Sequence, residues 1–385
     1  MTDDNPNAFK HAFNPAAIER IADAVGRATT DFDRDGFLGS VLPTLESLEM
    51  KARVALIAEA LHEHLALPFP DAVAALLSTL GPPGAPSGDD QWAPDASADG
   101  LLSGFTVWPV TRFVAVYGLE HPEEGLDALE QLTRRFTAEF ALRPYLLRHP
   151  EQTLERLRTW VQSPDQHLRR AASESTRPRL PWGIRLKPFI ADPEPVIDLI
   201  TPLRADPEDY VQKSVGNNLN DIGKDHPDRL LAVAEAWSAE GNGATDRIVK
   251  RAVRSLVKEG APGALRLMGY TVPAQARVEG PALSLSRLVL GQTQELTYTL
   301  VSTAAEPQRL LIDYVLHLVR ARGKTGTKVF KGKPIRLQPE ERRAMTFRLP
   351  LRAVTTRRYY PGEHRLQIQL CGERRDSLRF ELALE

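Results

Sequence analysis

The sequence contains a single cysteine, Cys371, among its 385 residues. One cysteine excludes an internal disulfide and every metal site that needs several cysteines. No apolar run approaches the ~20 residues that a membrane-spanning helix needs. The first residues, MTDDNPNAFKHAF, have neither a basic start nor an apolar core, so they do not form a secretory signal peptide. We therefore expect a cytoplasmic protein with no membrane partner.

Several signatures of bound groups are also missing. There is no cluster of cysteine and histidine, no helix-hairpin-helix signature and no glycine-rich phosphate loop. His62 and His64 are two residues apart and would point to different sides of a helix, whereas paired metal ligands on a helix are four apart. No lysine stands out as a Schiff-base nucleophile, which disfavours strand-cleaving lyase chemistry. We expect neither a metal nor a cofactor.

Charge is distributed unevenly along the chain although the net charge is only −1. Residues 1–130 carry 7 basic and 21 acidic residues, residues 131–270 carry 22 and 18, and residues 271–385 carry 20 and 11. Such asymmetry is a recognised indication of nucleic-acid binding. A polyanion would be met by the last two-thirds of the chain.

The length predicts two domains, and the sequence pattern divides them. Apolar residues follow helical spacing from Pro15 to Leu80, and residues 81–100 are rich in Pro, Gly, Ser and Asp, which indicates a loop insertion. Helices then continue to about Gly269, many beginning at a proline that follows a polar residue. Helix pairs that recur every 34 to 43 residues are typical of a HEAT-like α-solenoid, so the pattern predicts one over residues 1–270.

The remainder of the chain, residues 275–385, has a different pattern. Short segments such as ELTYTLVST and HRLQIQL alternate or run apolar and are separated by turn signals. Six to eight such strands predict an immunoglobulin-like β-sandwich without the cysteine pair of antibody domains. The stretch from Arg320 to Lys333 is rich in lysine and arginine, has no acidic residue, and is predicted to be a loop. Such a loop suits phosphate contacts, although a solubilising hairpin tip would have the same composition.

Two segments of the helical part repeat one pattern. Arg170 and Glu174 are one helical turn apart, and Lys213 with Asn217, followed by Asp221, repeats that spacing 43 residues later. The same phase upstream gives Arg135 and Glu139, and downstream gives Arg251. In a solenoid this column of basic residues would line one groove, although a row of solvated charges is the common alternative.

The segments SESTRPRLPWG and YVQKSVGNNLNDIGKDHP contain these residues and are unusual in composition. They resemble the AlkC family of bacterial DNA alkylation-repair glycosylases, relatives of AlkD that are built from HEAT-like repeats. The resemblance is strongest from about Thr133 to Ala261, and the order of parts fits nearly the whole chain. Some members of the family carry a C-terminal Ig-like domain.

The resemblance implies a set of site residues. Glu139, Glu174 and Asp221 match the family's acidic active-site positions, and Trp182 matches its active-site aromatic. Trp182 lies in a loop stiffened by Pro178 and Pro181. For the DNA-binding residues, the basic column, the two motifs and the basic loop together predict Arg135, Arg169, Arg170, Arg177, Arg179, Lys213, Asn217, Lys224, Arg251, Lys324, Lys328 and Lys331.

Carboxylates beside basic residues suit the cleavage of an N-glycosidic bond. That reaction develops positive charge on the sugar, which a fixed carboxylate stabilises. A base methylated at N3 is already cationic and leaves as a neutral molecule, so it needs little general-acid help. By family analogy we expect a monofunctional glycosylase that acts, as a monomer, on 3-methyladenine and 3-methylcytosine in double-stranded DNA, without flipping the base.

Two other functions fit the same residues. A non-catalytic HEAT-repeat protein could recognise DNA structure, with the acids serving only as ion-pair partners. A protein-binding scaffold could use the acidic first 130 residues as its contact surface. Release of a free methylated base separates the glycosylase from both, and salt-dependent DNA binding separates the other two.

Overall fold

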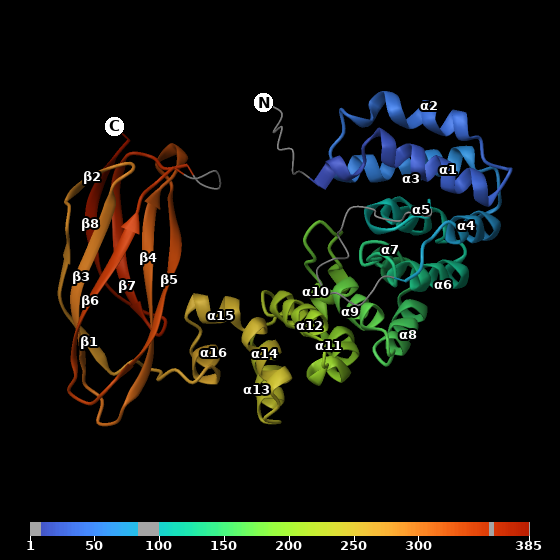
Figure 1. The fold of residues 1–385 in the computed structure, drawn as a ribbon. Coiled ribbons are helices and arrows are strands. Elements are labelled where there is room, and N and C mark those ends of the chain that lie inside the picture. The colour runs from blue at the N-terminus through green and yellow to red at the C-terminus, as the bar shows by residue number, and fades with distance from the viewer. Residues whose placement is uncertain (1–8, 84–99, 354–357, 385) are drawn as a thin grey trace. The chain divides into compact units, whose positions relative to one another are not determined.

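The computed structural model describes residues 9–83, 100–353 and 358–384 (Figure 1). The chain forms two compact units. The first comprises Met1–His226 and Ala236–Ala252, and the second comprises Pro227–Glu235 and Val253–Glu385. Helices fill the first unit and a β-sandwich dominates the second, which confirms the predicted fold class.

The amino-terminal region is helical, as the apolar spacing predicted, and contains four α-helices. They are preceded by a short 3-10 helix, η1, and the bounds are η1 (Phe9–Ala12), α1 (Pro15–Ala28), α2 (Arg34–Leu45), α3 (Met50–His64) and α4 (Phe69–Ser78). Of the predicted loop insertion at 81–100, residues 84–99, including Trp92, lie outside the described residues.

Helices continue from there to the predicted active-site segments. They are η3 (Gly104–Val107), α5 (Trp108–Tyr117), α6 (Pro122–Thr133), α7 (Leu142–Arg148), α8 (Pro150–Trp160), α9 (Gln166–Ser175), α10 (Lys187–Ala191), α11 (Glu194–Ile200), η4 (Thr201–Ala205) and α12 (Asp209–Ile222). Helices α6 and α8 begin at the prolines that marked them in the sequence. Trp160 is buried in this unit.

The last helices are α13 (Pro227–Ser238), α14 (Gly243–Ala252), α15 (Arg254–Glu259) and α16 (Pro262–Leu267). Helix α12 packs between α9 and α14. It contributes Val211, Val215 and Leu219 to the core at intervals of four residues. Gly216 allows the close approach of α14, because a Cβ there would lie 2.8 Å from the Cβ of Arg251.

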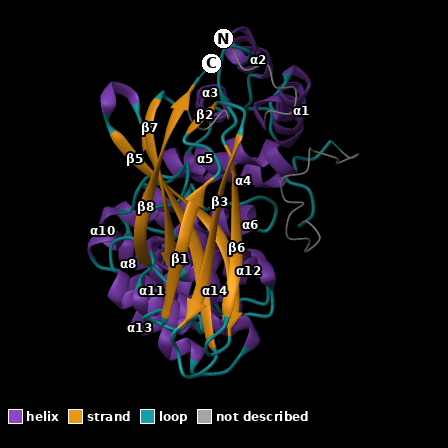
Figure 2. Cartoon of the chain, turned by 90° about the vertical axis from the view of Figure 1, so that its left-hand side faces the viewer, coloured by secondary structure: helices purple, strands orange, loops and turns teal. Residues whose placement is uncertain are grey.

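The sandwich has two sheets. Its strands are β1 (Ala276–Leu283), β2 (Arg287–Val289), β3 (Thr293–Ser302), β4 (Gln308–Val319), β5 (Thr325–Leu337), β6 (Arg342–Pro350), β7 (Gly362–Leu370) and β8 (Glu373–Ala383). One sheet has the order β1-β3-β6 and the other β2-β8-β7-β4-β5. Figure 2 shows β1, β3 and β6 side by side. Eight strands in two sheets confirm the immunoglobulin-like prediction.

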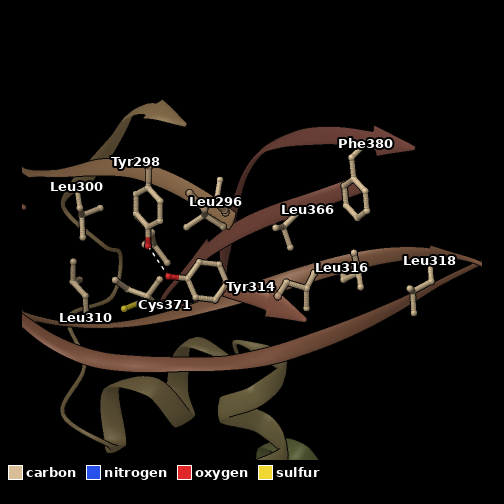
Figure 3. Packing of buried hydrophobic residues seen from close by; sticks show 14 of the residues in the cluster. Leu296, Tyr298, Leu300, Leu310, Tyr314, Leu316, Leu318, Leu366, Cys371 and Phe380 are labelled. Carbon is tan, nitrogen blue, oxygen red and sulfur yellow. Dashed lines mark hydrogen bonds between the residues drawn. The ribbon is translucent and has the colours of Figure 1, made fainter. Parts of the chain in front are cut away.

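Alternating residues of both sheets fill the sandwich core. Leu296 and Leu300 of β3 face Leu316 of β4 and Leu366 of β7 in one apolar cluster (Figure 3). Two buried tyrosines within it, Tyr298 and Tyr314, satisfy each other's hydroxyl groups at 2.9 Å. Leu265 of α16 belongs to the same cluster, so this helix packs on the sandwich.

Neither a membrane helix nor a metal cluster is found in the described parts of the chain. No described helix is long and apolar enough to cross a bilayer. Within the same residues, no three or more His, Cys, Asp or Glu side chains are placed to hold a metal ion. His62 stacks on Tyr117, with ring centroids 3.7 Å apart, and His64 contacts the Ser40 hydroxyl at 2.8 Å.

Candidate active site

The three predicted catalytic carboxylates come from three segments of the helical unit. Glu174 lies in the last turn of α9 and Asp221 in the last turn of α12. Glu139 lies between α6 and α7. The chain leaves the helix after Thr133, so the prediction that Arg135 and Glu139 share a helix face is wrong. Arg135 instead donates to the backbone oxygens of Gly81, at 2.6 Å, and Gln131, at 2.9 Å.

An unbroken chain of ion pairs joins the three acids. Arg170 donates to Glu139 Oε2 and lies 3.8 Å from Glu174 Oε1. Arg177 donates to Glu174 Oε1 at 2.6 Å and, through Nε, to Asp221 Oδ2 at 2.8 Å. Lys224 donates to Asp221 Oδ1 at 2.6 Å. We call these six residues the acid–base network: Glu139, Arg170, Glu174, Arg177, Asp221 and Lys224.

Packing of α9 against α12 explains how the network forms. The sequence repeat places Arg170 with Glu174 on one helix and Asp221 on its neighbour, and Arg177 follows α9 at the point where it can reach both acids. Ser214 of α12 adds a hydrogen bond to Glu174 Oε2 at 2.6 Å. Charges this deeply buried persist only when they are paired and hydrogen-bonded.

The six carboxylate oxygens of the network are not equally engaged. Both oxygens of Glu174 and both of Asp221 have partners within the network or at Ser214. Glu139 Oε2 accepts from Thr137, at 2.5 Å, and from Arg170. No described residue donates a hydrogen bond to Glu139 Oε1. Among the described residues, this oxygen is also not one of the fully buried polar side-chain atoms that lack a hydrogen-bond partner. Glu139 therefore has an oxygen available to a ligand.

Burial and neighbouring charge shift the pKa values of these acids in opposite directions. Burial raises the pKa of Glu139 above its ordinary value, against the opposing effect of the Arg170 guanidinium. Burial also acts to raise the pKa of Glu174, but Arg170, Arg177 and the Ser214 hydroxyl outweigh it and hold that pKa below its ordinary value. Two acids whose pKa values diverge in one site are suited to different roles.

Beside Glu139 is a cavity of about 280 Å³ with mostly apolar walls. Aromatic side chains from four segments surround the single carboxylate, and the lining residues are Phe9, Met50, Phe105, Trp108, Glu139, Phe140, Pro181 and Trp182. The Trp108 and Phe140 rings are stacked, with centroids 5.7 Å apart. Aromatic faces and one uncommitted carboxylate oxygen are suited to a flat cationic ligand.

Trp182 is 58% exposed and has a φ of 66°, in the left-handed region that residues with a side chain rarely adopt. Such a conformation costs about 1–3 kcal/mol and persists only when its surroundings enforce it. Arg143 holds the backbone before and after Trp182. The fully buried Arg143 side chain donates hydrogen bonds to the backbone oxygens of Ser175, at 2.7 Å, Arg177, at 2.9 Å, and Ile184, at 2.7 Å.

Sequence reasoning missed several of these residues. Arg143 stands alone in the apolar stretch ALRPYLL, and only the rarity of a charged residue in such a stretch hints that it is buried with partners. Burial lowers the pKa of Arg143 to about 10. Ser214 and the cavity aromatics Trp108 and Phe140 carried no signal, because their importance depends on which segments the fold brings together.

Apart from Arg135, the predicted DNA-binding residues of the helical unit divide into two groups. Arg169 pairs with Asp206 at 2.7 Å, Arg170 and Arg177 belong to the network, and Arg179 holds Asp225 through two hydrogen bonds. For these four arginines the structure favours the ion-pair interpretation. The other group of the helical unit is less buried: Lys213, paired with Asp209 at 2.9 Å, Lys224, and the half-buried Asn217 and Arg251.

The basic stretch of the second unit is a strand rather than the predicted loop. Only residues 320–324 form a turn, and Lys328 and Lys331 lie on β5, at the edge of the five-stranded sheet. Lys324, Lys328 and Lys331 are exposed. Lys331 is opposite Asp313 of β4, and neither Lys324 nor Lys328 forms an ion pair with a described residue.

Comparison with known proteins places this site in a family. A family model described as DNA alkylation repair enzyme matches residues 136–256, and one described as the C-terminal Ig-like domain of the uncharacterised protein YhaZ matches residues 277–384. The uncharacterized protein YhaZ of Bacillus subtilis (strain 168) is 34% identical over 375 residues, 97% of this chain and 99% of that protein.

A solved structure, Pseudomonas fluorescens alkylpurine DNA glycosylase AlkC bound to DNA containing an abasic site analog, is 35% identical, with a TM-score of 0.86 over 98% of this chain and 99% of that one. The chain belongs to the AlkC family. The resemblance that the sequence motifs suggested is thereby confirmed. All four predicted catalytic residues, Glu139, Glu174, Trp182 and Asp221, lie within the range of the alkylation-repair model.

Proposed function

We propose that this AlkC-family DNA repair glycosylase hydrolyses the N-glycosidic bond of cationic N3-methylated bases, 3-methyladenine and 3-methylcytosine, in alkylated double-stranded DNA. The observation that carries the proposal is the uncommitted Oε1 of Glu139 beside the aromatic cavity and Trp182. A carboxylate there attracts a cationic base, and the face of Trp182 adds a cation–π contact. Neutral bases gain neither contribution.

The acids stabilise the transition state unequally. As the bond breaks, positive charge moves from the base to the sugar, and a carboxylate held close to the sugar gains interaction energy. Glu139 is suited to this role because one of its oxygens is available. Glu174 is engaged on both oxygens and holds Arg170 and Arg177 in position, so we assign it a positioning role.

Asp221 becomes available to a water molecule when Lys224 leaves it. The side chain of Lys224 is 46% exposed, whereas that of Asp221 is only 1% exposed. A DNA phosphate competes with Asp221 for the ammonium group. When Lys224 moves to a phosphate, Asp221 Oδ1 can orient a water molecule, and the rest of the acid–base network, three acids and two arginines, carries a net charge of −1. Binding DNA thus makes the site anionic next to a cationic lesion.

We further propose that the enzyme is monofunctional and leaves the damaged base within the duplex. No lysine lines the cavity in the described part of the chain, which supports hydrolysis by water over Schiff-base chemistry. Its volume of about 280 Å³ is at the lower end of the range of ligand pockets. Trp182 projects outward and can approach a base that stays stacked. We also propose a cytoplasmic monomer that needs no cofactor.

The decisive experiment is base release from methylated duplex DNA, measured by chromatography with mass detection. The proposal predicts free 3-methyladenine and 3-methylcytosine, intact abasic strands until alkali is added, and no release of neutral, unmethylated bases at matched enzyme concentration. Salt-dependent binding without release would instead indicate a non-catalytic DNA-binding protein. Absence of both would favour a protein-binding scaffold.

A further inference from the structure

The turn from Pro181 to Lys187 carries two large apolar side chains that the protein leaves in solvent. Trp182 is 58% exposed and Ile184 is 51% exposed. Trp182 lines the aromatic cavity, whereas Ile184 does not. Two exposed apolar side chains on one short turn indicate a contact surface, since soluble proteins seldom gather such groups without a partner.

The backbone of this turn is held from both sides. Arg143 donates to the Ile184 backbone oxygen through Nε at 2.7 Å and also through Nη2. Lys51 of α3 donates to the Trp182 backbone oxygen. The Leu186 backbone nitrogen donates to Pro178 at 3.2 Å, which closes the turn. Ile184 is therefore a rigidly mounted apolar side chain and not part of a loose loop.

Two cations flank Ile184 on its carboxyl side. Arg185 and Lys187 are both exposed, and neither forms an ion pair or a side-chain hydrogen bond with any residue that the structure describes. Arg177 and Arg179, a few residues earlier, are both paired with acids. The turn thus offers an apolar tip followed by available positive charge, a combination that fits a nucleic acid and not an apolar protein groove.

We propose that Ile184 inserts as a wedge between base pairs next to the lesion while Arg185 and Lys187 bind the adjacent phosphates. Proteins that kink DNA insert Ile, Leu or Phe side chains between base steps in this manner. Opening one step would expose the lesion's glycosidic bond to Trp182 and Glu139 without extruding the base. This inference rests on the proposed function, because it assigns the wedge to the same lesion.

The wedge is tested with a duplex that carries 2-aminopurine beside an abasic analog. Binding of the parent should raise the 2-aminopurine fluorescence, because unstacked 2-aminopurine is bright. Ile184→Ala should remove most of that increase while thermal stability is retained. Leu147→Ala is the matched control, since Leu147 is a 46% exposed apolar residue on α7, and it should behave as the parent does. An equal fluorescence increase in Ile184→Ala and the parent overturns the wedge.

A duplex whose lesion is already unstacked distinguishes a wedge from a general DNA contact. Ile184→Ala should excise 3-methyladenine from a paired duplex about tenfold more slowly than the parent, and at the parental rate from a duplex in which mismatches already unstack the lesion. Equal slowing on both substrates overturns the proposal. Arg185→Ala with Lys187→Ala should lower the salt-dependence slope of binding by about 0.9 per phosphate contact. If the parent releases no base, the proposed function fails, while the fluorescence result still decides the wedge.

Discussion

The arginines of the acid–base network and the lysines in and just before strand β5 were both predicted to meet DNA, yet the structure places them in different environments. Arg177 is buried, the Arg170 side chain is only 12% exposed, and both are neutralised by acids. Lys324 and Lys328 are exposed and have no ion pair within the described residues. The net charge of a segment counts a paired arginine and an unpaired lysine equally. Only the availability of a cation shows whether it can meet a phosphate.

Removing a network arginine should have the largest effect. Arg177→Met leaves Glu174 and Asp221 without their shared partner in a site where the Asp221 side chain is 1% exposed. Breaking a buried pair by removing one member destabilises by about 3–5 kcal/mol. We expect a loss of that size in the free energy of unfolding, measured by urea denaturation. A stability equal to the parent's would show that the pairs are not maintained in solution.

The pH dependence of excision should reveal the unusual environment of the buried acids. Because burial raises the pKa of Glu139, the ionised form is lost at a higher pH than for an ordinary glutamate, whose pKa is about 4.3. The single-turnover rate should fall up to tenfold per pH unit as pH drops through that raised value. Glu174, with a lowered pKa, stays ionised over the same window.

The fold should tolerate protonation of Glu139. A raised pKa means that the native state prefers the neutral form, so this group stabilises below its unfolded-state pKa and loses that contribution as pH rises through the folded one. Circular dichroism across the range should show intact helices while the rate declines. An acid limb that coincides with unfolding would contradict the assignment.

The exposed lysines in and just before β5 should affect binding and not stability. Changing Lys324, Lys328 and the likewise exposed Lys333 to alanine should weaken binding to every duplex alike and lower the salt slope by about 0.9 per lost phosphate contact. The control is Arg277→Ala with Arg342→Ala, two exposed arginines already paired with Glu279. If the triple variant binds normally but self-associates, the lysines protect a sheet edge and do not contact DNA.

The half-buried pair of Arg179 and Asp225 should give the smallest effect. Their side chains are 27% and 22% exposed, intermediate between the network and β5. Pairs near the surface contribute little to the free energy of unfolding. Arg179→Ala should therefore lower the melting temperature slightly and leave the salt slope unchanged. A reduced slope would return Arg179 to the group of phosphate contacts.

The sequence was enough to predict the architecture because its signals are local. Proline-initiated helices, a 43-residue repeat and alternating strands each depend on neighbouring residues, and the repeat placed Glu174 and Asp221 on adjacent helices. Charge pairing was not predictable in the same way. Arg177 reaches Asp221, 44 positions away, and Arg143 reaches Ile184, 41 positions away. Those contacts depend on helix packing.

The sequence also could not show which carboxylate oxygens remain available to a ligand. Glu139 lies in the short motif FTAEF, which carries little signal in the sequence. The structure gives it the oxygen that remains uncommitted in the network, since it lies outside any helix at the cavity wall. Conversely, Glu174 belongs to the repeated pattern of the sequence, and both its oxygens are occupied.

Single-turnover excision of 3-methyladenine from duplex DNA by Glu139→Gln tests the central claim most directly. Loss of a fixed transition-state charge lowers rates by roughly a hundred- to a thousandfold. We expect at least a ~100-fold fall, with near-normal lesion binding and melting temperature, a similar fall for Asp221→Asn, and parental excision by Glu240→Gln, which alters an exposed acid paired with Arg204. Excision by Glu139→Gln within a few-fold of the parent would contradict the account and leave Glu139 as an ion-pair partner of Arg170.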